Sequence, residues 1–199
     1  LIIKVASIQS ARMQIYFIDN EDYFQRKSVL YDSGNKFFKD NDERAIFFAR
    51  GVLETVKKLG WSPDIVHCHG WITSLLPIYL KKAFVDNPIF SDTKIIYSIY
   101  NDDFPIQFNK NFADKIMLPG IKESDIEHYK KPSFVNITKA AIDFSDGVII
   151  GSPDINSDII NYVNQIDKPV LEFKSMDTYI DSYNEFYDEI LVNEKILSN

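Results

Sequence analysis

Cysteine is almost absent from this sequence, with Cys68 the single example among 199 residues. One thiol excludes an internal disulfide framework and is typical of a reducing compartment, so we expect a cytoplasmic protein. Long apolar runs are absent as well. The longest candidate, residues 71–80, is interrupted by Thr73, Ser74 and Pro77, whereas a membrane-spanning helix needs roughly 20 apolar residues. We therefore expect no membrane partner.

Positive charge is in deficit, because 22 Lys and Arg face 29 Asp and Glu and give a net charge of −7. Nucleic acids bind positive surfaces, so we expect no nucleic-acid partner. Glycine (7) and proline (8) are scarce and 45% of residues are hydrophobic, which is a globular composition. We predict a single domain over residues 1–199, and the strand-like start without Met suggests that the domain is N-terminally incomplete.

Apolar patterns predict strands that alternate with helices along most of the chain. Residues 1–8 and 13–18 are β-rich runs that we interpret as a hairpin, and an apolar helical stripe follows the acidic residues 40–43 and ends at Gly60. The remaining strands are expected at 64–68, 94–100, 147–151 and 169–173, and the remaining helices at 71–84, 133–145, 153–164 and 176–197. Pro77 should kink the first of these helices or lie near its first turns. This alternation predicts an α/β fold with a Rossmann-like, mainly parallel sheet and helices on both faces.

The stretch from Ser62 to Trp71 is the centre of the predicted architecture. Strand residues alternate between faces, so His67 and His69 share one face while Cys68 points to the other. Gly70 then permits a close approach of ligand or backbone. Because ligands of parallel sheets bind beyond the carboxyl ends of the strands, where the strand order reverses, that edge is expected to hold Gly70, residues 100–102 and Ser152.

Several residues here allow both a functional and a structural interpretation. His67 and His69 could bind a metal, but no third ligand is evident, so we predict structural histidines and no metal site. Asp102 and Asp103 could hold Mg²⁺ on a phosphate or could simply form a solvated turn. A Cys–His nucleophile is excluded by the opposed faces, and we predict neither a catalytic residue nor a cofactor.

Two further alternatives concern the expected ligand edge. Gly70 and Ser152 precede predicted helices and could cradle a phosphate, with Ser152 as N-cap and Pro153 at the first helical position. Trp71 and Tyr100 could form a platform on which a sugar stacks, or they could be core residues like most of the other aromatic side chains.

Four stretches together resemble the N-terminal catalytic domain of bacterial glycogen synthases and plant starch synthases, glycosyltransferase family 5. They are Ile-Tyr-Phe-Ile-Asp-Asn-Glu at 15–21, Asp-Glu-Arg at 42–44 with Phe-Phe at 47–48, Trp-Ser-Pro-Asp-Ile-Val-His-Cys-His-Gly-Trp at 61–71, and Asp-Phe-Ser-Asp-Gly-Val at 143–148 with Ser-Pro at 152–153. The similarity covers nearly the whole chain in the same order, and the central motif is specific.

The resemblance implies one half of a GT-B glycosyltransferase of glycogen biosynthesis, a hexosyltransferase that moves glucose from ADP-glucose to an α-1,4-glucan with retention. A sugar nucleotide or an α-glucan is thus the expected partner. The resemblance places the substrate-binding residues at His69, Gly70, Trp71, Tyr100, Asn101 and Ser152.

Three positions depart from the family pattern. The family reads His-Asp-Trp-His where this chain reads His69-Gly70-Trp71-Ile72, and Tyr100 replaces a glucose-contacting histidine. The family's Lys-x-Gly-Gly-Leu loop and nucleotide-binding domain have no counterpart. We therefore predict that the chain alone is inactive or incomplete; the alternative is a pseudoenzyme, a non-catalytic module that binds glucan or a protein partner.

Overall fold

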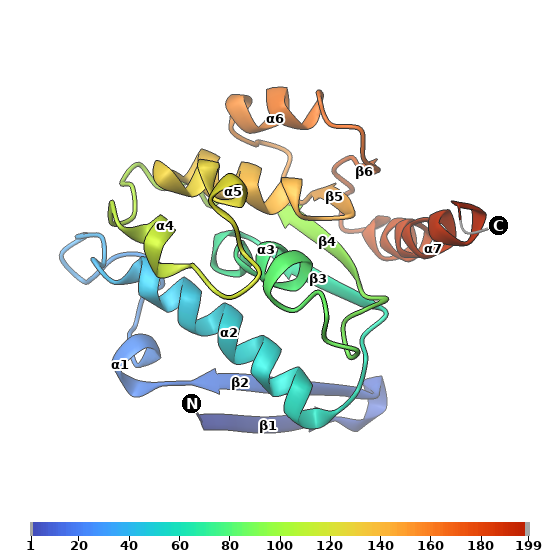
Figure 1. Ribbon diagram of the computed structural model, residues 1–199, viewed down its shortest axis with the longest axis horizontal. Helices are drawn as coiled ribbons and strands as arrows, with labels where there is room; N and C mark the ends of the chain where they lie inside the picture. The colour runs from blue at the N-terminus through green and yellow to red at the C-terminus, as the bar shows by residue number, and fades with distance from the viewer. Residues whose placement is uncertain (1, 198–199) are drawn as a thin grey trace.

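The computed structural model describes the backbone of residues 2–197 and the side chains of residues 2–192. Its N-terminal part is an antiparallel hairpin of β1 (Ile2–Ile8) and β2 (Met13–Asp19), joined by a 3-10 turn over residues 9–11 (Figure 1). Arg12 closes that turn with a left-handed φ of 50°. The predicted hairpin is confirmed over the described residues.

A separate sheet of four parallel strands follows, and its bounds lie within two residues of those predicted. The strands are β3 (Ile65–His69), β4 (Lys94–Ile99), β5 (Gly147–Ile150) and β6 (Val170–Leu171). They lie in the order β3-β4-β5-β6, and every neighbouring pair is parallel. Within residues 2–197 the strand order does not reverse, so the predicted reversal is not found there. The carboxyl edge is the edge at which all four parallel strands end.

Helices cover both faces of this sheet, as predicted. Alternate residues of the strands, such as Cys68, Tyr97 and Val148, are buried in the main core with α2 (Asn41–Leu59) and α5 (Phe134–Asp143). The residues between them form a second, smaller core with α7 (Tyr179–Leu197). It consists of Ile96, Ile149, Phe186 and Ile190.

The helix predicted to end at Gly60 is α2, and both of its ends follow elementary capping rules. Asp42 and Glu43 lie in its first turn and Lys57 and Lys58 in its last, so each charge opposes the helix dipole. Gly60 adopts a φ of 71°, and its N–H donates to the Val56 carbonyl at 3.1 Å. A glycine in this left-handed conformation ends the helix without side-chain strain.

The helix predicted over residues 71–84 does not form as one element. The segment is instead a 3-10 turn (71–73), a short α3 (Leu76–Ile78) and a π turn (79–83). Pro77 lies in the first turn of α3, where its missing N–H costs no helical hydrogen bond. A proline at that position starts a new helix rather than continuing the one before it.

The irregular segment 104–132 contributes to the core despite its polar composition. It contains α4 (Phe112–Lys115) and two 3-10 turns over 123–125 and 127–130. Phe104 and Phe108 of this segment are buried and pack edge-to-face on Trp71, which is only 4% exposed. Phe112 packs on Phe108 and Tyr129 on Phe112, so the buried aromatic cluster continues away from Trp71. The long loop is therefore structural in its centre.

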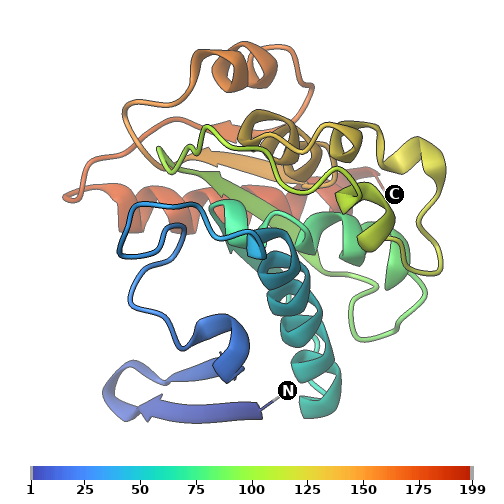
Figure 2. The same ribbon diagram turned by 90° about the vertical axis from the view of Figure 1, so that its left-hand side faces the viewer.

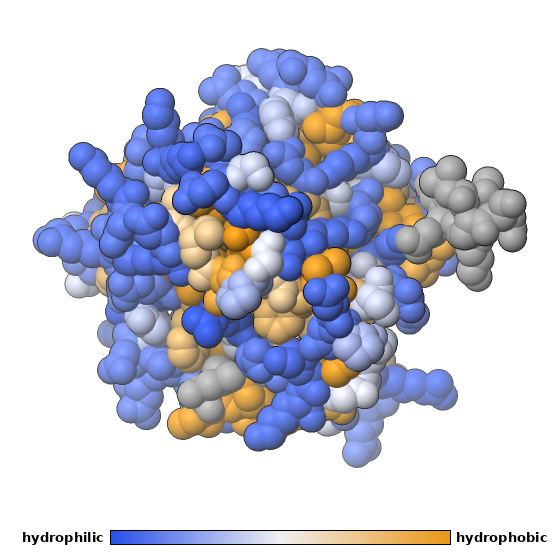
Figure 3. All heavy atoms as spheres, viewed as in Figure 1, coloured by the Kyte–Doolittle hydropathy of each residue, from blue (hydrophilic) through white to orange (hydrophobic). Residues whose placement is uncertain are grey.

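The one-turn helix α1 (Glu21–Phe24) follows β2 in the chain. The hairpin of β1 and β2 lies apart from the parallel sheet, on the far side of α2 (Figure 2). Its apolar side chains Ile2, Val5 and Phe17 are each more than half exposed, and Figure 3 shows apolar surface along this side of the molecule. No helix of residues 2–197 has the length and apolar character that crossing a bilayer requires.

Candidate functional site at the carboxyl edge

The carboxyl ends of β3, β4 and β5 meet at one edge, and backbone hydrogen bonds hold their loops together. The Gly70 N–H donates to the Ser98 carbonyl at 3.1 Å, and the Gly151 N–H donates to the Ile99 carbonyl at 2.8 Å. The Asn101 N–H donates to the Ser152 hydroxyl at 3.2 Å. The expected edge is thus assembled, because parallel strands deliver these loops to the same side.

Ser152 has a different role from the one predicted. The helix expected from residue 153 begins only at Ser157, as α6 (Ser157–Val163), and its cap is Asn156, whose side chain accepts from the Asp158 N–H at 2.9 Å. Ser152 therefore does not lie at a helix N-terminus, and only a 3-10 turn follows Gly70. The geometry for a phosphate cradle at these two positions is not formed.

Gly70 is required by a neighbouring carboxylate. Its backbone has φ 67° and ψ −174°, a combination that is nearly restricted to glycine. A Cβ atom there would lie 2.6 Å from Oδ2 of Asp102, and that oxygen accepts the Trp71 N–H at 3.3 Å. Asp102 thus places a carboxylate in the space beside Gly70.

The contact between Asp102 and Gly70 was not predicted from the sequence, in which Asp102 was interpreted only as a metal ligand or a turn residue. Burial raises the pKa of Asp102 despite the backbone hydrogen bonds that favour its charged form. Asp103 instead accepts from the Asn156 amide at 3.0 Å, so the two carboxylates serve different partners. Among the described residues, no group of three or more His, Cys, Asp and Glu side chains could hold a metal ion.

His67 and His69 share a face of the sheet, as predicted, and their ring centroids lie 3.9 Å apart. Both ring nitrogens of His67 are hydrogen-bonded at 2.7 Å, to the Tyr187 hydroxyl on α7 and to the Ser98 hydroxyl. Burial, and secondarily the neighbouring His69, lowers the pKa of His67 to about 3. His67 is therefore a neutral structural histidine.

His69 lies at the exposed end of the same strand and is the more accessible of the two histidines. Its Nδ1 lies 2.8 Å from the Tyr100 hydroxyl, and the two rings stack with an interplanar angle of 22°. The ring of Tyr100 also lies against Gly151, where a Cβ atom would be 2.6 Å from its Cε1. Gly151 thus makes room for Tyr100, whose pKa is raised by burial.

Five of the six predicted substrate-binding residues lie at this edge with polar atoms that contact a neighbouring loop or strand, or are exposed, namely His69, Gly70, Tyr100, Asn101 and Ser152. Trp71 contributes only its backbone N–H, because its ring is buried among phenylalanines. The interpretation of Trp71 as a sugar-stacking platform is therefore wrong, and its alternative as a core residue is confirmed. The remaining groups are hydrogen-bond donors and acceptors suited to hydroxyl groups.

Comparison with known proteins identifies the family. Residues 1–168 match the family model described as the starch synthase catalytic domain. The chain belongs to this family. The resemblance inferred from the four motifs is confirmed.

Individual relatives of the family agree with this assignment. The glycogen synthase of Chlorobium limicola is 45% identical over 50% of this chain and 20% of its own length. That of Geotalea daltonii is 35% identical over 76% of this chain and 28% of its own length. This chain thus spans less than a third of these curated relatives.

The fold also matches a solved member of the family. The catalytic domain of starch synthase IV from Arabidopsis thaliana, bound to ADP and acarbose, superposes with a TM-score of 0.63. The match covers 88% of this chain and 37% of that chain at 19% sequence identity. The parallel sheet of this family member is thus one half of a GT-B fold.

Proposed function

We propose that this chain is the glucan-binding half of a glycogen/starch-synthase-type glucosyltransferase, and that its carboxyl edge binds an α-1,4-glucan. The family's overall reaction would be transfer of glucose from ADP-glucose to the glucan end with retention. The observation that carries this proposal is the cluster of uncharged hydrogen-bonding groups around Tyr100. The imidazole of His69 lies beside that ring, and Asn101, the next residue after Tyr100, is exposed and carries a side-chain amide.

Charge favours a neutral glucan over a nucleotide at this edge. The loops 70–74, 100–104 and 151–156 contain three aspartates and no lysine or arginine. A diphosphate needs cations or helix N-termini for its charge, whereas sugar hydroxyls pair well with amides, imidazoles and carboxylates. We therefore expect the edge to bind malto-oligosaccharides and to bind ADP weakly or not at all.

Catalysis is expected to need more than this edge, so the chain alone should bind glucan without transferring glucose. The groups that would neutralise a departing ADP are not among the edge residues, and uncompensated charge in a transition state costs several powers of ten in rate. The single Cys68 supports a cytoplasmic setting for such an enzyme.

The binding test is ligand-observed saturation-transfer NMR with maltotetraose, ADP-glucose and ADP, followed by titration calorimetry. Maltotetraose is expected to bind, and Asn101→Ala to weaken it by about tenfold, the value of one hydrogen bond of roughly 1.4 kcal/mol. Asn161→Ala, an exposed position on α6, is the matched control. Tight binding of ADP, or indifference to Asn101→Ala, would contradict the proposal.

A pseudoenzyme is the second candidate, favoured by Gly70 and Tyr100 where the family has a carboxylate and a histidine. Turnover of radiolabelled ADP-glucose into glycogen by the natural full-length protein separates the two. Incorporation at a rate typical of glycogen synthases excludes the pseudoenzyme. Glucan binding without incorporation favours it.

A further inference from the structure

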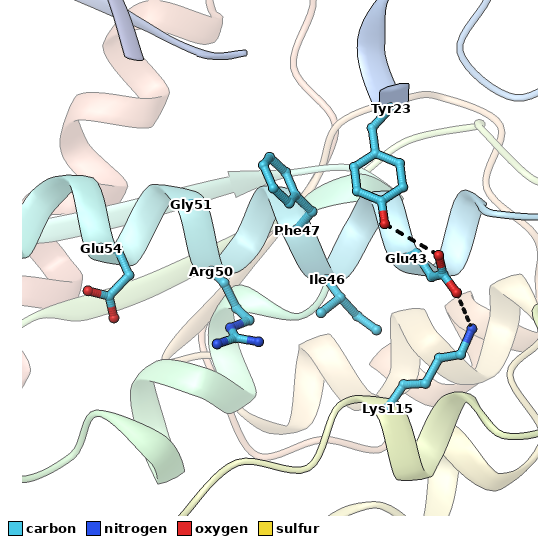
Figure 4. Close-up of a pocket in the computed structure, with 8 residues that line it drawn as sticks. All are labelled: Tyr23, Glu43, Ile46, Phe47, Arg50, Gly51, Glu54 and Lys115. Atoms are coloured by element: carbon cyan, nitrogen blue, oxygen red, sulfur yellow. Dashed lines mark hydrogen bonds and ion pairs between the residues drawn. The ribbon is translucent and has the colours of Figure 1, made fainter. Parts of the chain in front are cut away.

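A hollow lies away from the carboxyl edge and shares no residue with it. It has a volume of about 560 Å³ and lies between α1, α2 and α4 (Figure 4). We call it the α2 pocket; its lining residues are Tyr23, Glu43, Ile46, Phe47, Arg50, Gly51, Glu54 and Lys115. Sites for small ligands are typically hollows of roughly 300–1,000 Å³, so the size suits one.

The α2 pocket combines ring surfaces with polar groups. Tyr23 and Phe47 are half-buried, with centroids 5.3 Å apart and planes inclined at 55°. Ring faces of this kind pack against the C–H surfaces of a ligand. Gly51, one turn after Phe47, adds no side chain to the space although glycine costs a helix interior about 1 kcal/mol relative to alanine.

One end of the α2 pocket is fixed by a network of contacts. Glu43 accepts from the Tyr23 hydroxyl at 3.3 Å and from Lys115 at 2.8 Å, as Figure 4 shows. Lys115 also donates at 2.9 Å to Asp42, a buried carboxylate that the Asn109 amide contacts at the same distance. These contacts join α1, α2 and the α4 region, so this end is preorganised for a ligand.

Charges around the α2 pocket balance, and this excludes strongly charged ligands. An anion would face Glu43 and Glu54, and a cation would face Arg50 and Lys115. Within the described side chains no carboxylate pairs with Arg50, whose guanidinium is exposed, while Glu54 contacts only Lys57, at 3.0 Å. Arg50 thus offers up to five N–H donors to hydroxyl oxygens.

We propose that the α2 pocket is a second carbohydrate site, which holds a distant segment of the same neutral α-glucan that binds at the carboxyl edge. Rings for the sugar C–H faces, together with a guanidinium and carboxylates for its hydroxyls, are the groups such a ligand requires. The identity of the ligand rests on the proposed function. Two sites on one polymer raise its apparent affinity by effective concentration, whereas a short oligosaccharide reaches only one site at a time.

The experiment compares a polymer with an oligomer. Affinity electrophoresis through glycogen and calorimetry with maltotetraose are run on the wild-type chain, Arg50→Ala and Lys58→Ala. Lys58→Ala removes an exposed cation from the same helix outside the α2 pocket. We expect Arg50→Ala to weaken glycogen binding at least about fivefold while maltotetraose binding at the edge stays unchanged, and Lys58→Ala to change neither.

A second variant keeps the result decisive if Arg50 acts only as a distant charge. Phe47→Ser removes one of the two rings that line the α2 pocket, and circular dichroism first tests whether this variant is folded. If Phe47→Ser is unfolded, Tyr23→Phe is used instead, because it removes only the hydroxyl. Loss of glycogen affinity in either folded variant supports the second site. Glycogen binding that is lost with Asn101→Ala but unaffected by both Arg50→Ala and the folded second variant overturns the α2 pocket alone. Failure of the wild-type chain to bind any glucan overturns the proposed function as well.

Discussion

Replacement of Gly70 by alanine tests the central geometry of the carboxyl edge. At φ 67° and ψ −174° a side chain costs roughly 1–3 kcal/mol in backbone strain. The new Cβ would also lie 2.6 Å from Oδ2 of Asp102, so the carboxylate must move away. Its hydrogen bond from the Trp71 N–H would then weaken, which costs about 1 kcal/mol of stability. We expect Gly70→Ala to lower the free energy of unfolding by about 3 kcal/mol.

Gly60→Ala provides the matched control. Gly60 also has a positive φ, 71°, but a Cβ atom there would meet nothing within 4 Å. Only the cost of the left-handed conformation remains, about 1 kcal/mol. The difference of about 2 kcal/mol between the two variants therefore measures what is special about position 70.

A double-mutant cycle isolates the contact with Asp102. In an Asp102→Ala background the contact no longer exists, and Gly70→Ala should cost about 1 kcal/mol less than in the wild type. Urea unfolding followed by circular dichroism gives all four free energies. Equal costs for Gly70→Ala and Gly60→Ala, or an unchanged cost without Asp102, would refute the reasoning. Gly70→Asp, which restores the family residue, should cost more than Gly70→Ala because it opposes two carboxylates.

Further predictions concern other buried polar groups. The pKa of His67 is about 3 in the folded chain against 6.5 for an unperturbed histidine, so the unfolded chain binds a proton first and the free energy of unfolding falls as the pH falls below 6.5. Urea unfolding should show a loss of about 2 kcal/mol between pH 7 and 5. His67→Gln should make the free energy of unfolding less dependent on pH in this range. Tyr187→Phe removes the hydroxyl bonded to His67 and should cost about 1 kcal/mol in the same assay at pH 7. Lys168 donates to the carbonyls of Ile142, Asp143 and Ser145 at the end of α5, so Lys168→Met should lower the melting temperature while Lys110→Met, at an exposed position, should not. Cys68 is fully buried, so a thiol reagent should label it only after unfolding; rapid labelling of the native chain would contradict the described core.

Helices and strands with a short-range sequence pattern could be predicted from the sequence. The hairpin, α2 and the parallel strands each have such a pattern, for example the apolar stripe that ends at Gly60 or the β-branched run of β5. The residues at which helices begin were harder to predict. Both Ser152 and Asn156 can cap a helix, and only the structure shows that Ser152 is engaged by the Asn101 N–H while Asn156 caps α6. Pro77 likewise divides a segment whose composition alone favours one helix.

The sequence by itself determined the α/β class, the family and the residues that gather at the carboxyl edge, because strand direction and motif order are properties of the chain. Tertiary structure alone decided how the side chains are used. Trp71 became core because aromatic residues 30 to 40 positions later pack around it, and Asp102 lies beside Gly70 because parallel pairing aligns the ends of β3 and β4. The α2 pocket likewise combines three segments that no local pattern connects. Such contacts depend on long-range packing, which propensity and periodicity do not encode.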